Sequence, residues 1–226
     1  MNLKILSLVI IGVCILLPDV CYAFLEKDVH LLNMQNGLAD NTVSAVYKDK
    51  EGFVWFGTRN GLSRYDGRQI TNFEQSNSYP SISNLKEVFD GVLAFVDNGV
   101  FSAFDLKKER FLSVVSSSEK RIPSWGMLQK NDSLVWVISG SELHLMKRCA
   151  SKEGELRLRV QEKYTGWDNQ DNLLVAITYS SDKKSICLID EKGRIILLDA
   201  TNLNSFRVID LGRTGSLSVN SVLYDD

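Results

Sequence analysis

The sequence predicts an all-β fold made of β-propeller blades, each a four-stranded antiparallel meander. Three observations support this. Apolar residues alternate with period two over short runs, turns rich in Gly, Asn and Asp separate these runs every 6 to 10 residues, and a unit of four runs recurs along the chain. No stretch has the periodicity of a helix. An immunoglobulin-like sandwich also has short strands, but it does not predict a four-run unit with a glycine turn in its middle.

The first 23 residues have the layout of a secretory signal peptide. A single cation, Lys4, precedes an apolar run at 5–17, and the small residues Cys21 and Ala23 occupy the positions that a signal peptidase reads. The run is shorter than the roughly 20 residues that a membrane-spanning helix needs. We therefore expect residues 1–23 to be removed and the protein to be exported to the periplasm. Retention of the segment as an anchor is the alternative.

The remaining region, 24–226, is expected to be a partial propeller of about four blades. Its clearest unit has apolar runs at 42–47, 53–58, 62–67 and 70–73, with Asn60-Gly61 as the tight turn between the second and third runs. The corresponding turn glycines of the four units are 38, 41 and 53 residues apart. These spacings bracket the roughly 40 to 50 residues of a propeller blade. The predicted blades cover approximately 40–75, 82–116, 122–164 and 171–211.

The second, third and fourth units repeat the pattern less regularly. Because a single blade exposes two apolar faces, neighbouring blades must cover one another. Trp55 and Trp136 occupy equivalent positions in the second runs and are expected in the core between blades. The predicted strands are 82–89, 92–96, 100–105 and 111–115 in the second unit, 125–128, 134–138, 143–146 and 156–160 in the third, and 173–178, 186–189, 195–199 and 206–209 in the fourth.

One segment carries a family resemblance. Residues 41–67, NTVSAVYKDKEGFVWFGTRNGLSRYDG, closely resemble the two-component regulator propeller repeat, and Asn36-Gly37-Leu38 resembles its lead-in. The later units lack the Trp-x-Gly-Thr core and follow the repeat mainly in register. The resemblance implies a non-catalytic periplasmic sensor region of a membrane-bound hybrid two-component protein that carries a histidine kinase. Propellers of this family detect breakdown products of polysaccharides and control transcription of the genes that use them.

The end of the chain predicts a further blade. Residues 221–226 align without gaps on residues 44–49, so a fifth unit is expected to begin at 217–226. We therefore expect the chain to be the amino-terminal piece of a longer sensor, through a truncated gene or as a fragment. Its partners would be the remainder of the propeller and a second subunit, with the full-length protein anchored in the inner membrane.

Charge and motifs argue against several other functions. With 26 basic and 28 acidic residues, the chain has no basic surplus for binding nucleic acid. The two histidines, His30 and His144, lack the spacing of a zinc site, and neither a nucleophile elbow nor a phosphate-binding loop is present. We therefore expect no metal, cofactor or catalytic residue in this chain. The rival function is a secreted propeller lyase or hydrolase with its active site in missing blades, and a scaffold for assembly is a third.

Cys149 and Cys187 remain after export, where a disulfide is permitted, but separate core positions are favoured.

The ligand site is predicted at one end of the blades. Because loops alternate between the two ends of a meander, the lead-in of each blade and its second turn lie at the same end. Polar residues there suit an oligosaccharide or a similar small ligand, and Arg59 is placed to bind a carboxylate. Ordinary turn formation is the alternative for each of them. The candidate residues are Asn36, Asp40, Arg59, Asn60, Asn98 and Glu142.

Overall fold

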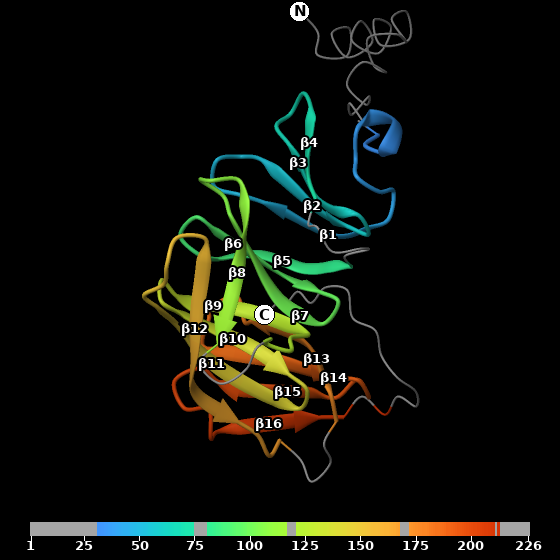
Figure 1. Ribbon diagram of the computed structural model, residues 1–226. Coiled ribbons are helices and arrows are strands. Elements are labelled where there is room, and N and C mark those ends of the chain that lie inside the picture. Colours follow the sequence, from blue (N-terminus) through green and yellow to red (C-terminus); the bar gives the residue numbers. More distant parts are fainter. Residues whose placement is uncertain (1–30, 75–80, 117–120, 168–171, 211, 213–226) are drawn as a thin grey trace, which may run out of the picture.

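The computed structural model describes residues 31–74, 81–116, 121–167, 172–210 and 212, and Figure 1 shows their arrangement. The predicted signal peptide at 1–23 and the predicted blade start at 217–226 lie outside the described residues. Strands β1 to β16 make up nearly all the regular structure of the described ranges, together with one short 3-10 helix, η1 (Met34–Asn36). The predicted all-β class is confirmed.

Consecutive strands pair antiparallel in four meanders, which we call blades 1 to 4. Blade 1 contains β1 (Val43–Lys48), β2 (Val54–Thr58), β3 (Gly61–Tyr65) and β4 (Ile70–Phe73), and blade 2 contains β5 (Ile82–Phe89), β6 (Val92–Asp97), β7 (Val100–Asp105) and β8 (Arg110–Ser116). Blade 3 contains β9 (Gly126–Asn131), β10 (Leu134–Ser139), β11 (Glu142–Cys149) and β12 (Glu155–Tyr164). Blade 4 contains β13 (Leu174–Tyr179), β14 (Ser185–Asp190), β15 (Ile195–Asp199) and β16 (Phe206–Ile209).

The turn between the second and third strands has a positive φ in every blade, which favours glycine. The four glycines are Gly61 (φ +114°), Gly99 (+76°), Gly140 (+63°) and Gly193 (+80°). In blade 1 the preceding Asn60 does not share the positive φ that Asn-Gly predicts. There the Thr58 side chain closes the turn, because its Oγ1 accepts from the Asn60 N–H (3.1 Å) and donates to the Gly61 carbonyl (2.9 Å).

The blades pack face to face through three apolar clusters. Trp55 and Phe95 belong to the cluster between blades 1 and 2. Val96 and Met127 belong to the cluster between blades 2 and 3, and Trp136 lies in the cluster between blades 3 and 4. Trp55 and Trp136 are each only 1% exposed, so their predicted place in the core between blades is confirmed. This burial of flank against flank supplies the main driving force for the fold.

The first strands of the blades lie next to one another. Strand β5 contacts β1 on one side and β9 on the other, and β9 also contacts β13. The starts of these four strands all lie at the same end of the molecule. We call this row of inner strands the hub, and Figure 1 shows the blades following one another from β1 to β16.

Blades 2 and 3 are joined in a way that the sequence did not predict. Strand β8 pairs in parallel with β12, so that the two blades form one sheet in the order β5-β6-β7-β8-β12-β11-β10-β9. Residues 113–116 of β8 lie opposite residues 155–158 of β12. Glu153, in the turn before β12, accepts from Lys108 (2.7 Å) and Arg110 (3.0 Å). The outer edges of these two blades therefore satisfy each other's backbone groups.

Cys149 and Cys187 are both free thiols, as the separate positions favoured from the sequence require. Cys187 is buried as expected, whereas Cys149 is only partly buried and is not a core residue.

Candidate functional site

The meanders have two ends that differ in character. The lead-in end contains the segment before the first strand of each blade and the turn between its second and third strands. The far end contains the other two turns of each blade. The predicted site residues all belong to the lead-in end, as the alternation of the strands requires.

In blade 1 the lead-in folds back over the outer side of the sheet. The Ala39 N–H donates to Ser63 Oγ (3.1 Å), and Asn72 Nδ2 donates to the Gly37 carbonyl (2.8 Å). Leu38, between these two lead-in residues, is buried. The lead-in is therefore part of the blade and not a loose strap.

Three of the predicted residues take part in this lead-in structure. Asp40 Oδ1 accepts from the Thr42 N–H (2.6 Å), and Asn60 Nδ2 donates to the Ala39 carbonyl (3.4 Å). Asn36 closes η1 through its backbone N–H, which donates to Asn33 Oδ1 (3.1 Å). The Asp40 and Asn36 contacts form local turns, whereas the Asn60 contact ties the second turn of blade 1 to its lead-in. The side chains of Asp40 and Asn60 are therefore partly occupied by backbone groups of blade 1.

Arg59 is exposed, and its backbone N–H donates to the Thr42 carbonyl (3.3 Å). Among the residues that the structure describes, none pairs with its guanidinium, which leaves that group available to an anion. Asn98 lies in the second turn of blade 2 with φ +49°, and its Nδ2 donates to Asp97 Oδ1 (3.0 Å). Burial raises the pKa of the neighbouring Asp97 carboxyl.

Glu142 begins β11 and is already engaged in blade 3. Its Oε2 lies 2.6 Å from His144 Nε2 and 3.4 Å from Lys163 Nζ. The hydrogen bond from His144 and the charge of Lys163 together lower the pKa of Glu142. The structure thus places the six predicted residues at one end but on three blades, with close grouping only in blade 1.

Three exposed apolar residues lie at the hub, and none of them is among the residues predicted to bind a ligand. Trp125, immediately before β9, is 48% exposed, and Leu173, immediately before β13, is 40% exposed. Val43 starts β1 and is also exposed. These three residues precede or open the inner strands, so they lie at the lead-in end. The sequence feature that could have identified them is their position, because each lies where the first strand of a blade begins.

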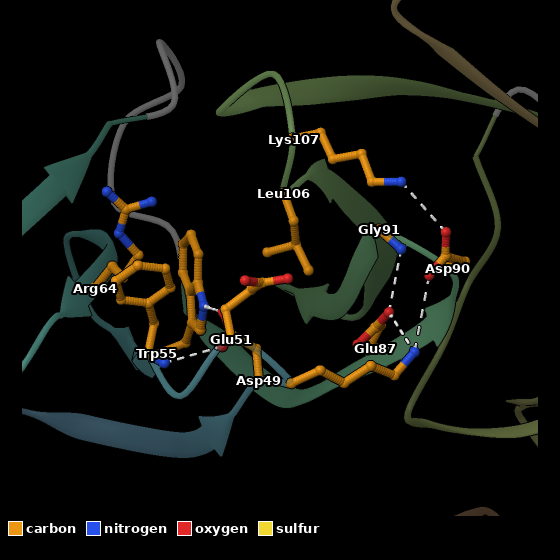
Figure 2. A pocket seen from close by; sticks show the side chains of 11 residues that line it. Asp49, Glu51, Trp55, Arg64, Glu87, Asp90, Gly91, Leu106 and Lys107 are labelled. Carbon is orange, nitrogen blue, oxygen red and sulfur yellow. Dashed lines mark hydrogen bonds and ion pairs between the residues drawn. The ribbon is translucent and has the colours of Figure 1, made fainter.

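A cavity of about 230 Å³ lies at the other end of the molecule, between blades 1 and 2. Figure 2 shows that the turn after β1 and the turns after β5 and β7 surround it. None of the six predicted residues lines it. Its lining residues are Asp49, Lys50, Glu51, Phe53, Trp55, Arg64, Glu87, Asp90, Gly91, Leu106 and Lys107.

The charges of this cavity are largely paired with one another. Glu87 accepts from Lys50 Nζ (3.1 Å) and from the Gly91 N–H (3.1 Å), and Asp90 lies between Lys50 (3.9 Å) and Lys107 (3.4 Å). The interaction with Glu87 raises the pKa of Lys50. This network ties the first turn of blade 1 to two turns of blade 2, as Figure 2 shows.

The apolar wall of the cavity is fixed by Asp49. Its Oδ2 accepts from Trp55 Nε1 (2.7 Å) and its Oδ1 from the Phe53 N–H (2.9 Å). Arg64 stacks 4.7 Å from the Phe53 ring centroid and pairs with Glu109. These contacts occupy the side chains that a ligand would need, so the cavity is better explained as a join between blades than as a binding site.

Within the described ranges, no group of three or more His, Cys, Asp and Glu side chains is placed to hold a metal ion. Nor is there, in that same part of the chain, a helix long and apolar enough to cross a membrane.

Comparison with known proteins gives one family and a set of similar folds. The sequence model of the two component regulator propeller family matches residues 37–60. This segment contains the lead-in and the first two strands of blade 1, and the resemblance found in the sequence is confirmed there. No curated protein matches the chain in sequence.

Two similar solved structures come from B. thetaiotaomicron. The extracellular domain assigned to the hybrid two component system BT3049 is 18% identical with a TM-score of 0.61, over 81% of this chain and 24% of that one. The extracellular domain assigned to the one component system BT4673 is 14% identical with a TM-score of 0.61, over 82% and 27%. The chain therefore spans about a quarter of the length of these proteins.

Virginiamycin B lyase from Staphylococcus aureus is also similar, at 11% identity and a TM-score of 0.53, over 74% of this chain and 55% of the lyase. At these identities the likenesses establish the fold alone.

Proposed function

We infer from the two component regulator propeller repeat that this chain is part of the ligand-sensing region of a two-component signal transduction protein. The match at 37–60 is the observation that carries this inference. The residues of that segment have evident roles in a blade, since Trp55 fills the space between blades and the Thr58 side chain closes the second turn. The extracellular domain assigned to the hybrid two component system BT3049, which shares the fold, supports the same function.

We propose further that the protein is periplasmic, exported by the segment at 1–23, and that in full length it is anchored in the inner membrane and carries a histidine kinase. The remainder of the propeller and a second subunit would complete the sensor. The proposed ligand is an oligosaccharide, and the proposed output is transcription of genes for polysaccharide use. The polar lead-in end, with the exposed side chain of Arg59, supports a hydroxyl-rich or acidic ligand.

Calorimetric titration of the full-length protein with a panel of oligosaccharides tests this function, with product analysis after the titration. The proposal predicts saturable binding with no change in the glycan. Cleavage of a glycan would contradict it and favour the rival lyase or hydrolase. Absence of binding across the panel would exclude a carbohydrate sensor.

A further inference from the structure

One cation of the hub has no counter-ion in the described part of the chain. Lys86 lies on the inner strand β5 and is half-buried, and among the residues that the structure describes none forms an ion pair or hydrogen bond with its ammonium. Burial lowers the pKa of Lys86. Since a charged group removed from water costs free energy unless it is paired, an unpaired half-buried lysine needs an explanation.

Lys86 lies on the side of β5 that faces blade 3. It is paired directly with Ala94, and residues directly opposite in a sheet present their side chains on the same face. Ala94 packs in the apolar cluster between blades 2 and 3 together with Met127 of β9. The Lys86 side chain therefore leaves β5 on the face that lies toward β9.

The backbone of an exposed tryptophan is held at the junction of blades 2 and 3. The Trp125 N–H donates to the Ile138 carbonyl (3.1 Å), and the Trp125 carbonyl accepts from Asn84 Nδ2 (2.9 Å). Asn84 is two residues before Lys86 on β5. The backbone of Trp125 is thus held from blades 2 and 3, while its side chain remains 48% exposed.

The backbone of β5 is irregular at this point. Asn84 has φ +52°, which is uncommon for a residue other than glycine, and the pairing with β6 shifts between Ser83 and Lys86. A bulge of this kind redirects a side chain and is frequent beside functional sites. Here it turns the Asn84 amide toward the backbone of Trp125.

We propose that Lys86 and Trp125 form a subsite for a sugar ring that carries a carboxylate group. The indole of Trp125 supplies an apolar face on which the sugar ring stacks. The ammonium of Lys86 supplies the positive charge that pairs with the carboxylate of the sugar. This inference rests on the proposed carbohydrate-sensing function and narrows it to acidic sugars. It differs from the six residues predicted at the turns, because it places recognition at the hub.

Titration of the full chain with trigalacturonic acid and with its trimethyl ester tests the subsite. The ester keeps the rings but removes their charge. Because Trp55, Trp136 and Trp167 are buried, acrylamide quenching of tryptophan fluorescence reports mainly on Trp125. We expect the acid to bind more tightly than the ester and to protect the fluorescence from quenching.

Two variants separate the roles of charge and ring. Lys86→Gln is expected to weaken binding of the acid by about tenfold or more and leave binding of the ester unchanged, because a hydrogen bond to a charged group is lost. Trp125→Ala is expected to weaken both ligands. Lys86→Arg, which retains the charge, should keep the preference for the acid. Lys184→Gln, at the far end of blade 4, removes the same net charge and should change neither affinity.

Four results would overturn the subsite. Equal affinity of the native chain for acid and ester would exclude recognition of the carboxylate, whether or not Lys86→Gln folds. Unchanged binding of the acid to a folded Lys86→Gln variant would exclude Lys86. Binding of neutral trisaccharides such as maltotriose without binding of the acid would refute the subsite and leave the sensing function in place. Absence of binding to any of these glycans would contradict both.

Discussion

Gly57 permits the close approach of blades 1 and 2. A Cβ atom added at Gly57 would lie 2.7 Å from Ile82 Cγ2, 3.0 Å from the Ile82 carbonyl oxygen and 3.3 Å from Ala45 Cβ. Ile82 is fully buried, and its carbonyl accepts from Ser44 Oγ, so neither the side chain nor the backbone has room to withdraw. Gly57→Ala therefore forces the inner strand β5 away from blade 1.

We expect Gly57→Ala to lower the free energy of unfolding by about 1–3 kcal/mol, the usual cost of an overpacked core. For a domain of this size, that corresponds to a fall in Tm of roughly 2–12 °C. Urea and thermal unfolding, followed by circular dichroism, measure both quantities. The matched test is a double-mutant cycle with Ile82→Ala, which removes the clashing methyl group.

The cycle decides whether the contact itself is responsible. If Gly57→Ala acts through Ile82, then Ile82→Ala must cost at least about 0.5 kcal/mol less in the Gly57→Ala background than in the native chain. Strictly additive effects, or a Gly57→Ala variant as stable as the native chain, would show that the two blades do not meet at this residue.

Three further predictions concern titratable groups. Because burial lowers the pKa of Lys86, its charged form destabilises the fold at neutral pH. Lys86→Met should therefore raise the free energy of unfolding at pH 7 by on the order of 1 kcal/mol, and this gain should shrink as pH rises toward 10.5. Equal stability of the two proteins at pH 7 would contradict this prediction. Hydrogen bonds from the Lys184 N–H and Ser180 Oγ lower the pKa of Asp182 to about 2. The stability that the Asp182 carboxylate contributes is therefore complete above its ordinary pKa of 3.8 and is lost as pH falls through about 2. An Asp182 titration midpoint near 3.8, measured by NMR, would refute the turn geometry. Burial raises the pKa of the Cys187 thiol, so iodoacetamide should label Cys149 and spare Cys187 in the native chain. Peptide mass mapping detects the labelled thiols. Rapid labelling of both would show that blade 4 is open.

The repeated unit could be predicted because its signals are local. Period-two alternation and the glycine turns act within a few residues of each other, and they placed the strands of all four blades near their observed positions. The burial of Trp55 and Trp136 followed from the same register. Local signals are sufficient for these features because each meander closes on itself through short turns.

The features that were missed arise from contacts between blades. The parallel pairing of β8 with β12 joins residues about 40 positions apart in the sequence. The ion pairs of Glu153 with Lys108 and Arg110 link blade 3 to blade 2 over a similar separation. The far-end cavity depends on turns of two blades in the same way.

The predicted site was limited for a similar reason. Asp40 and Asn60 were identified as polar and exposed, but their hydrogen bonds to the lead-in backbone could not be read from the sequence. The exposure of Trp125 depends on how blades 2 and 3 hold its backbone. Alternation along a strand does not determine these contacts.

The central claim is that successive meanders pack flank to flank about a row of inner strands. NOE spectroscopy on a sample with labelled isoleucine methyl groups tests it directly at two junctions. Gly57 approaches Ile82 across blades 1 and 2, and Gly126 approaches Ile177 across blades 3 and 4, where an added Cβ would lie 3.4 Å from Ile177 Cγ2. The account predicts strong NOEs from both glycine Hα pairs to these methyl groups. Absence of both, in a chain whose four meanders are otherwise formed, would contradict it.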